Sequence, residues 1–173
     1  MTAVRIREID TPLGSLLAGA SEHAASLLAF DDQDDTPRHL LKLAAASGAM
    51  PTYGAYPIHD RLEAELAAYF AGDLRDFTVP VELVGTDFQR AVWTQISAVP
   101  YGQTRAYGVL AKALSGDAKA SRAVAAANGQ NRIAIMIPCH RVVGADGGLT
   151  GYAGGLARKR ALLALEAGQG GLF

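Results

Sequence analysis

The chain has 173 residues, of which 50% are hydrophobic and 19% charged, with a net charge of −1, a balance typical of a folded globular protein. No apolar run approaches the roughly 20 residues needed to cross a bilayer, and residues 1–7 lack the apolar stretch of a secretory signal. The single cysteine, Cys139, excludes an internal disulfide framework and a Cys-rich metal site, so we expect no metal and a reduced, cytoplasmic setting.

Three short apolar runs open the chain, over residues 4–9, 13–20 and 24–30. Turn-forming residues separate them, and this spacing predicts an antiparallel meander of three strands. After an acidic loop, two helical patterns follow, over about residues 37–47 and 58–71. Nothing in this half proposes chemistry. Residues 1–80 are therefore expected to form an α/β scaffold domain.

The second half differs in charge. Residues 1–84 hold 6 Lys and Arg against 13 Asp and Glu, whereas residues 85–173 hold 10 against 4. A basic half attracts phosphate, which favours a nucleic-acid partner. Charge also varies along any chain, so the asymmetry alone is a modest argument.

The helical pattern also changes here. Thr86 and Gln89 have the spacing of a capping box, which predicts a helix to about Val99. Thr104 is expected to cap a second helix to about residue 114, and a third is expected over 118–128, closed by Gly129. Two short helices joined by a tight turn suggest a helix-turn-helix. The third is rich in alanine, which fits either a core helix or a close approach to another surface.

The segment that contains the candidate catalytic residues follows these helices. A strand-like apolar run over residues 131–137 ends at Pro138 and delivers Cys139 and His140 side by side. A lone cysteine is more often an inert small hydrophobe. A thiol attacks carbon only as the thiolate, and its ordinary pKa of roughly 8.5 calls for a neighbouring base or positive charge. His140 is the candidate base, and the pair favours a reactive thiol.

A histidine base usually needs a carboxylate to orient it. Residues 156–166 are predicted to form a helix in which Glu166 shares a face with Leu162 and Leu163. That partly buried face is where a carboxylate can meet His140. An ordinary surface glutamate near a helix end fits the spacing equally well.

These motifs resemble the O6-alkylguanine-DNA alkyltransferases, also called methylated-DNA–protein-cysteine methyltransferases. The resemblance spans roughly residues 85–166. It is carried by Thr86-Asp87-Phe88-Gln89, Pro100-Tyr101-Gly102, Ser121-Arg122-Ala123-Val124, Asn128-Gly129-Gln130-Asn131, Ile137-Pro138-Cys139-His140-Arg141-Val142 and Tyr152-Ala153-Gly154-Gly155-Leu156.

The resemblance implies a set of catalytic residues and no cofactor. Cys139 would accept the alkyl group of O6-alkylguanine, or of O4-alkylthymine, once per molecule. His140 and Glu166 would activate the thiol, in part through a water. Asn131 matches the asparagine that holds the active-site turn, and Tyr107 the tyrosine that donates to the departing guanine.

It also implies how DNA is bound. The helix-turn-helix would enter the minor groove of double-stranded DNA, and the damaged nucleotide would rotate out of the stack. The protein would act as a monomer, with cooperative binding along DNA left open. The residues matched to DNA or to the base pocket are Arg122, Ala123, Asn128, Val142, Tyr152 and Ala153.

The implied fold class is α+β, with a small ribonuclease H-like antiparallel sheet at the amino terminus. Residues 81–173 would form a DNA-binding and active-site domain with a helical winged helix-turn-helix. The turn before the third helix is about one residue longer than in some relatives, and Ala153 lacks a side-chain hydroxyl. Two alternatives stay open: a non-catalytic module that recognises alkylated DNA, and a cysteine hydrolase built on Cys139, His140 and Glu166.

Overall fold

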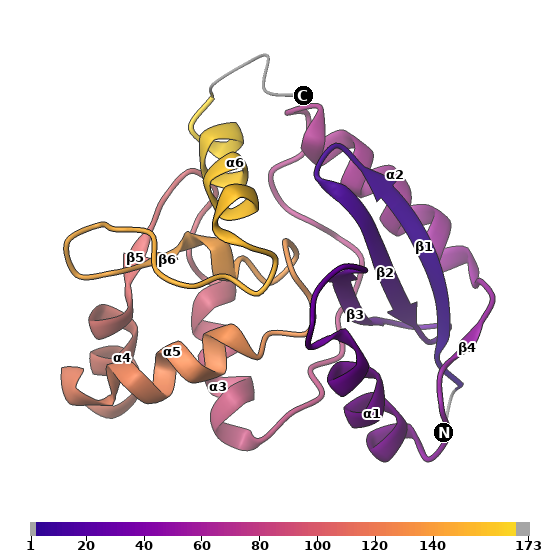
Figure 1. Cartoon of the computed structure of the whole chain (residues 1–173), viewed down its shortest axis with the longest axis horizontal. Helices are drawn as coiled ribbons and strands as arrows, with labels where there is room; N and C mark the ends of the chain where they lie inside the picture. Colours follow the sequence, from indigo (N-terminus) through magenta and orange to yellow (C-terminus); the bar gives the residue numbers. More distant parts are fainter. Residues whose placement is uncertain (1–2, 169–173) are drawn as a thin grey trace. The chain divides into compact units, whose positions relative to one another are not determined.

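The computed structural model describes residues 3–168 and arranges them in two compact units that divide after Val84. The first unit contains one sheet and two helices (Figure 1). Its elements in chain order are β1 (Arg5–Thr11), β2 (Gly14–Ala20), β3 (Ala25–Phe30), α1 (Thr36–Ser47), β4 (Thr52–Tyr53) and α2 (Pro57–Phe70).

The sheet has the strand order β3-β2-β1-β4. The predicted antiparallel meander is confirmed, since β1 pairs with β2 and β2 with β3 in antiparallel register. The sheet is mixed, however, because β4 runs parallel to β1. That strand has only two residues, both exposed, so it carries no hydrophobic alternation that sequence reasoning could detect.

The connector after α2 covers part of the β3 edge. Ala25 donates to the carbonyl of Pro80 at 2.9 Å and accepts from the amide of Glu82 at 2.8 Å. This pairing satisfies backbone groups that an edge strand otherwise leaves open. It also keeps residues 81–84 with the first unit, later than the boundary at residue 80 drawn from the sequence.

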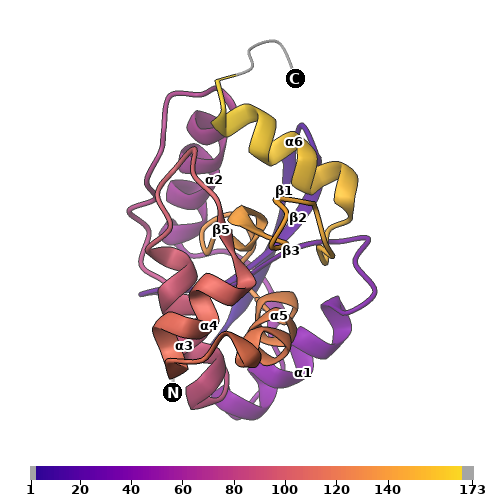
Figure 2. The same ribbon diagram turned by 90° about the vertical axis from the view of Figure 1, so that its left-hand side faces the viewer.

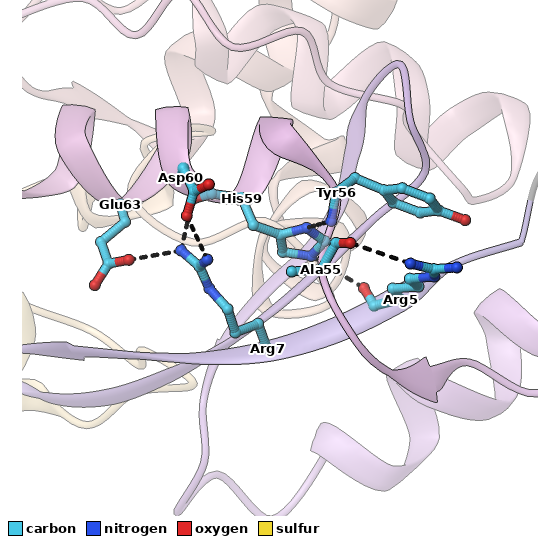
Figure 3. Close-up of polar contacts among 7 residues, drawn as sticks. All are labelled: Arg5, Arg7, Ala55, Tyr56, His59, Asp60 and Glu63. Carbon is cyan, nitrogen blue, oxygen red and sulfur yellow. Dashed lines mark hydrogen bonds and ion pairs between the residues drawn. The ribbon is translucent and has the colours of Figure 1, made fainter.

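A cluster of polar contacts fixes α2 against β1 (Figure 3). The guanidinium of Arg7 bonds to Asp60 at 2.7 Å and to Glu63 at 2.6 Å. The ring of His59 is fully buried, where Nδ1 accepts from the amide of Tyr56 at 3.0 Å and Nε2 lies 3.2 Å from the carbonyl oxygen of Arg5. Each ring nitrogen thus meets a backbone group, so the cluster is structural.

The second unit is mainly helical and includes a two-stranded parallel ribbon. Its elements are α3 (Asp87–Ser97), β5 (Arg105–Ala106), α4 (Tyr107–Ser115), η1 (Ala118–Ala120), α5 (Ser121–Gly129), η2 (Cys139–Arg141), β6 (Val142–Val143) and α6 (Leu156–Glu166). The α+β class, with a small amino-terminal sheet and a helical carboxyl-terminal region, is confirmed. Helices α4 and α5 lie side by side (Figure 2), while the ribonuclease H-like and winged helix-turn-helix assignments stay predictions.

Trp93 joins α3 to α5 in the core of this unit. Its indole is 1% exposed and donates from Nε1 to the carbonyl of Ala127 at 2.8 Å. The guanidinium of Arg132 lies 5.6 Å from the ring centroid. Gly85 comes so close that a Cβ there would meet the indole at 2.7 Å. Among the described residues, no helix is both long and apolar enough to cross a membrane.

Two sequence-based helix ends were wrong. Helix α4 begins at Tyr107 with Ala106 as its N-cap, because Thr104 precedes the strand β5, which pairs with β6. Gly129 does not adopt a positive φ; it is the last residue of α5, and Gln130 is the C-cap. Both predictions relied on local capping residues. The start of α4 lies later than predicted because the preceding residues pair with β6.

Replacing Thr86 by alanine should lower the free energy of unfolding by about 1 kcal/mol. The Thr86 hydroxyl accepts from the amide of Gln89 at 3.1 Å, and the Gln89 side chain accepts from the amide of Thr86 at 3.0 Å. Thr104→Ala is the matched control, because this exposed threonine caps no helix. Its replacement should change the free energy of unfolding by less than about 0.5 kcal/mol. Urea unfolding of both variants measures this; equal losses would contradict the cap assignment.

Candidate active site

The run over residues 131–137 forms a tight turn and not the predicted strand. Oδ1 of Asn131 accepts from the amide of Ile133 at 3.0 Å, and Nδ2 donates to the carbonyl of Ile137 at 2.8 Å. Ile135 has a φ of 71°, a left-handed conformation that is rare for a β-branched residue. A short apolar run does not distinguish a strand from a buried turn. The turn ends at Pro138 and so sets the start of η2, where Cys139 lies.

Strain in this turn is held by its surroundings. A β-branched residue in the left-handed region costs on the order of 1–3 kcal/mol and persists only where other contacts over-determine it. Here Ile135 is 2% exposed, and the amide of Ile137 donates to the carbonyl of Ile133 at 3.0 Å. The turn is therefore held by two sets of hydrogen bonds, those of the Asn131 side chain and the backbone bond between Ile137 and Ile133.

Cys139 and His140 are both buried, at 5% and 0% exposed. Burial raises the pKa of the Cys139 thiol, and this is opposed by its hydrogen bond with Asn131 and by the charge of Lys159. Burial also lowers the pKa of His140, which the hydrogen bond and charge of Glu166 oppose. Both shifts favour the uncharged forms, a thiol at Cys139 and a neutral imidazole at His140.

Glu166 places its carboxylate between His140 and Arg141. Oε2 lies 2.7 Å from Nε2 of His140, and Arg141 donates to Oε1 from Nε at 2.7 Å and to Oε2 from Nη2 at 3.0 Å. A carboxylate accepts only, so Nε2 carries the ring proton and Nδ1 keeps its lone pair. Nδ1 is buried and bonds to no protein atom among residues 3–168.

From the sequence, Arg141 was placed only within the matched motif around Cys139 and was given no role of its own. The structure turns it toward Glu166, and its Nη1 also donates to the carbonyl of Val99 at 2.7 Å. Its side chain is 7% exposed and that of Glu166 only 1%, so this ion pair is desolvated. Sequence spacing carries no signal for this contact, because the partners are far apart in the chain.

Lys159 was missed by sequence reasoning. It is fully buried on α6, and its ammonium donates to the carbonyls of Val142 at 2.6 Å, Thr150 at 2.9 Å and Gly151 at 3.5 Å. Burial lowers its pKa, and the charge of Cys139 opposes that shift. Its position, three residues before Leu162 and seven before Glu166, puts it on their buried face. That spacing is the signal that was available.

The two tyrosines of the predicted site both lie in the second unit. Tyr107 is the first residue of α4, and its hydroxyl accepts from Oγ1 of Thr150 at 3.2 Å. The Tyr152 hydroxyl is buried without a hydrogen-bond partner among residues 3–168. Burial, followed by the charge of Cys139, raises its pKa well above the usual range. Ala153 is exposed in the turn before α6.

The residues matched to DNA divide by exposure. Arg122 and Ala123 lie exposed on α5, as does Ala126 one turn later. Asn128 is 5% exposed and Val142 is fully buried, so neither presents its side chain to solvent. The carbonyl of Val142 is instead held by Lys159. Among residues 3–168, no group of three or more His, Cys, Asp or Glu side chains is placed to hold a metal ion.

The free energy of unfolding should depend on pH through Cys139 and His140. The folded-state pKa of Cys139 lies above its ordinary value, so the unfolded chain loses that proton first and stability falls as pH rises above roughly 8.5. The folded-state pKa of His140 lies below its ordinary 6.5, so the unfolded chain binds that proton first and stability falls below about pH 6.5.

Cys139→Ala separates these two effects. The variant should lose part of the alkaline fall and keep the acidic one, when denaturant unfolding is followed from pH 5 to pH 10. An alkaline fall of equal size in both proteins would mean that the thiol is not buried as the structure has it.

Comparison with known proteins gives consistent matches. A family profile described as "6-O-methylguanine DNA methyltransferase, DNA binding domain" matches residues 87–168. The methylated-DNA–protein-cysteine methyltransferase of Mycobacterium tuberculosis (strain ATCC 25618 / H37Rv) is 44% identical over 164 residues, which cover 94% of this chain and 92% of that protein. The protein of that name from Methanosarcina acetivorans is 56% identical over 102 residues, 59% of this chain and 65% of that one.

Solved structures agree. The crystal structure of Mycobacterium tuberculosis O6-methylguanine methyltransferase superposes with a TM-score of 0.80 at 43% identity, covering 97% of this chain and 95% of that one. A crystal structure of Mycobacterium tuberculosis OGT in complex with DNA gives 0.81 at 42% identity, over 95% and 94% of the two chains. The enzyme from the archaeon Pyrococcus kodakaraensis strain KOD1 gives 0.60 at 26% identity, over 94% and 98%.

Proposed function

The chain belongs to the methylated-DNA–protein-cysteine methyltransferase family, whose members repair DNA by alkyl transfer to a cysteine, and we propose that Cys139 is that cysteine here. One observation carries the assignment. The only cysteine of the chain is followed directly by a buried histidine whose Nε2 lies 2.7 Å from a buried carboxylate and whose pKa burial lowers. A nucleophile, a base and a group that orients the base are the parts that thiol activation needs.

The proposed reaction is a displacement at the alkyl carbon of O6-alkylguanine. The thiol proton moves to Nδ1 of His140, directly or through a water, and Glu166 stabilises the imidazolium that forms. The thiolate then forms a bond to the alkyl carbon while the carbon–O6 bond breaks and its electron pair stays with the base. The guanine anion takes up a proton from solvent, which restores guanine, and the imidazolium returns the thiol's proton to solvent, so the protons balance.

Tyr107 is proposed to assist the leaving group. A phenol that donates to the guanine offsets the negative charge developing on the ring. The product is a thioether on Cys139, and a carbon–sulfur bond of this kind is not hydrolysed under the reaction conditions. Each protein molecule therefore acts once.

The DNA-facing surface is proposed to be α5. Its exposed positions carry Arg122 and the small residues Ala123 and Ala126, and these allow a close approach in a minor groove about 6 Å wide. The reacting carbon is attached to a paired base edge inside the stack, so the nucleotide must rotate out, at a cost of a few kcal/mol. Arg122 would fill the gap left by the rotated nucleotide, and Tyr152 and Ala153 would line the base pocket.

The decisive experiment is a titration of the protein with duplex DNA that carries one O6-methylguanine per molecule. Intact-mass spectrometry should show at most one added methyl group per protein, peptide mapping should place it on Cys139, and the DNA should contain guanine at the lesion. O4-methylthymine duplex tests the second substrate. Tight lesion binding without thiol modification would instead support a recognition module. Repeated turnover of an ester or amide would support a cysteine hydrolase.

A further inference from the structure

We propose that Lys159 and Thr150 are positioning residues that hold the phenol of Tyr107 at the leaving group. This inference rests on the proposed function, in which Tyr107 donates to the departing guanine. Lys159 ties residues 150 and 151 to the strand that follows Cys139, and the Thr150 hydroxyl then fixes the orientation of the Tyr107 hydroxyl.

Lys159 joins two segments that are separate in the chain. Its ammonium bonds to the carbonyl of Val142, in β6 just after the nucleophile, and to the carbonyls of Thr150 and Gly151. An ammonium has three donors and no acceptor, so three carbonyls satisfy it fully. A buried lysine left without such partners would be costly, and the contact therefore holds both segments together.

The same strand also positions the backbone of Tyr107. Strand β6 pairs with β5 through Arg105 with Val142 and Ala106 with Val143, and Tyr107 follows β5 directly. Val142 thus contacts the segment that leads into Tyr107 on one side and Lys159 on the other. The backbone leading to Tyr107 and the backbone of Thr150 are therefore both held in place relative to Val142, three residues after Cys139.

Thr150 adds control of the hydroxyl itself. Its Oγ1 donates to the Tyr107 oxygen at 3.2 Å. A phenol oxygen that accepts this bond must direct its own single proton elsewhere. Between two hydroxyls the donor is set by their other partners, and with Thr150 donating the phenol proton stays available to a base in the pocket.

The test compares Thr150→Val, which keeps the shape and loses the hydroxyl, with Thr150→Ser, which keeps the hydroxyl. Single-turnover transfer from an O6-methylguanine duplex should be slower by about two- to tenfold in Thr150→Val. Thr150→Ser should recover most of the rate. Thr150 is exposed, so both variants are expected to fold.

A second background separates positioning from general structure. When Tyr107 is replaced by phenylalanine, no phenol proton remains to be oriented, so Thr150→Val should cause no further loss of rate. Lys159→Met should also slow transfer, in part because it removes a charge that lowers the pKa of Cys139, and adding Thr150→Val to it should have a smaller effect than in the parent protein.

Two results would overturn the proposal. One is an unchanged rate in Thr150→Val, and the other is an equal fold-loss with and without the Tyr107 hydroxyl. Either result can be observed only if the parent protein transfers methyl to Cys139. Absence of transfer in the parent would instead reject the proposed function, so the two failures are distinguishable.

Discussion

Replacing Cys139 by alanine should abolish alkyl transfer while DNA binding survives. No other thiol exists in the chain that could accept the group. Removing a catalytic nucleophile typically lowers a rate on the order of 10⁶-fold, which places the residual reaction below detection. The measurement is retention of the label on DNA carrying O6-[methyl-³H]methylguanine, with binding followed separately by fluorescence anisotropy.

Cys139→Ser is the closer control, because it preserves a polar group of similar size at the same buried position. A serine hydroxyl is a much weaker nucleophile than a thiolate, and its proton is far harder to remove, so transfer should again be lost. Label transfer by either variant would move the acceptor to another residue. Loss of DNA binding along with transfer would point to misfolding, which the unfolding curves would show.

The first unit shows which parts of the fold the sequence could predict. The three strands appear as short apolar runs and the two helices as helical patterns, and turn-forming residues such as Thr11 and Pro12 separate the first pair of strands. Strand β4 has no pattern because both of its residues are exposed, and its pairing with β1 depends on where α1 places the chain. Long-range pairing of so short a segment leaves no local signal.

Some residues of the site could likewise be predicted from the sequence and others could not. Cys139 and His140 are adjacent in sequence, and the resemblance to known alkyltransferases pointed to Glu166 on the helical face that the structure buries. The buried cations were not found. Sequence reasoning treats lysine and arginine as solvated, whereas Arg141 and Lys159 are enclosed because a carboxylate and three carbonyls satisfy them. Only tertiary contacts reveal such exceptions.

Glu166→Ala should have the largest effect on stability of any change in the site. It leaves the guanidinium of Arg141 buried beside a cavity with its main partner gone, and breaking a buried ion pair in this way costs about 3–5 kcal/mol. Folded proteins are stable by only about 5–15 kcal/mol, so this is a large share of the total. Urea unfolding measures it, with Glu166→Gln as the isosteric comparison.

Glu166→Gln should separate stability from chemistry when it is combined with Arg141→Met. The double variant has no unpaired charge at this position, so its unfolding free energy should exceed that of Glu166→Gln alone. Transfer should not recover, because His140 still lacks the carboxylate that stabilises its imidazolium, and general-base assistance contributes about 10²–10⁴-fold. If stability and rate returned together, Glu166 would act only through Arg141, and its bond to His140 would have no part in activating the thiol.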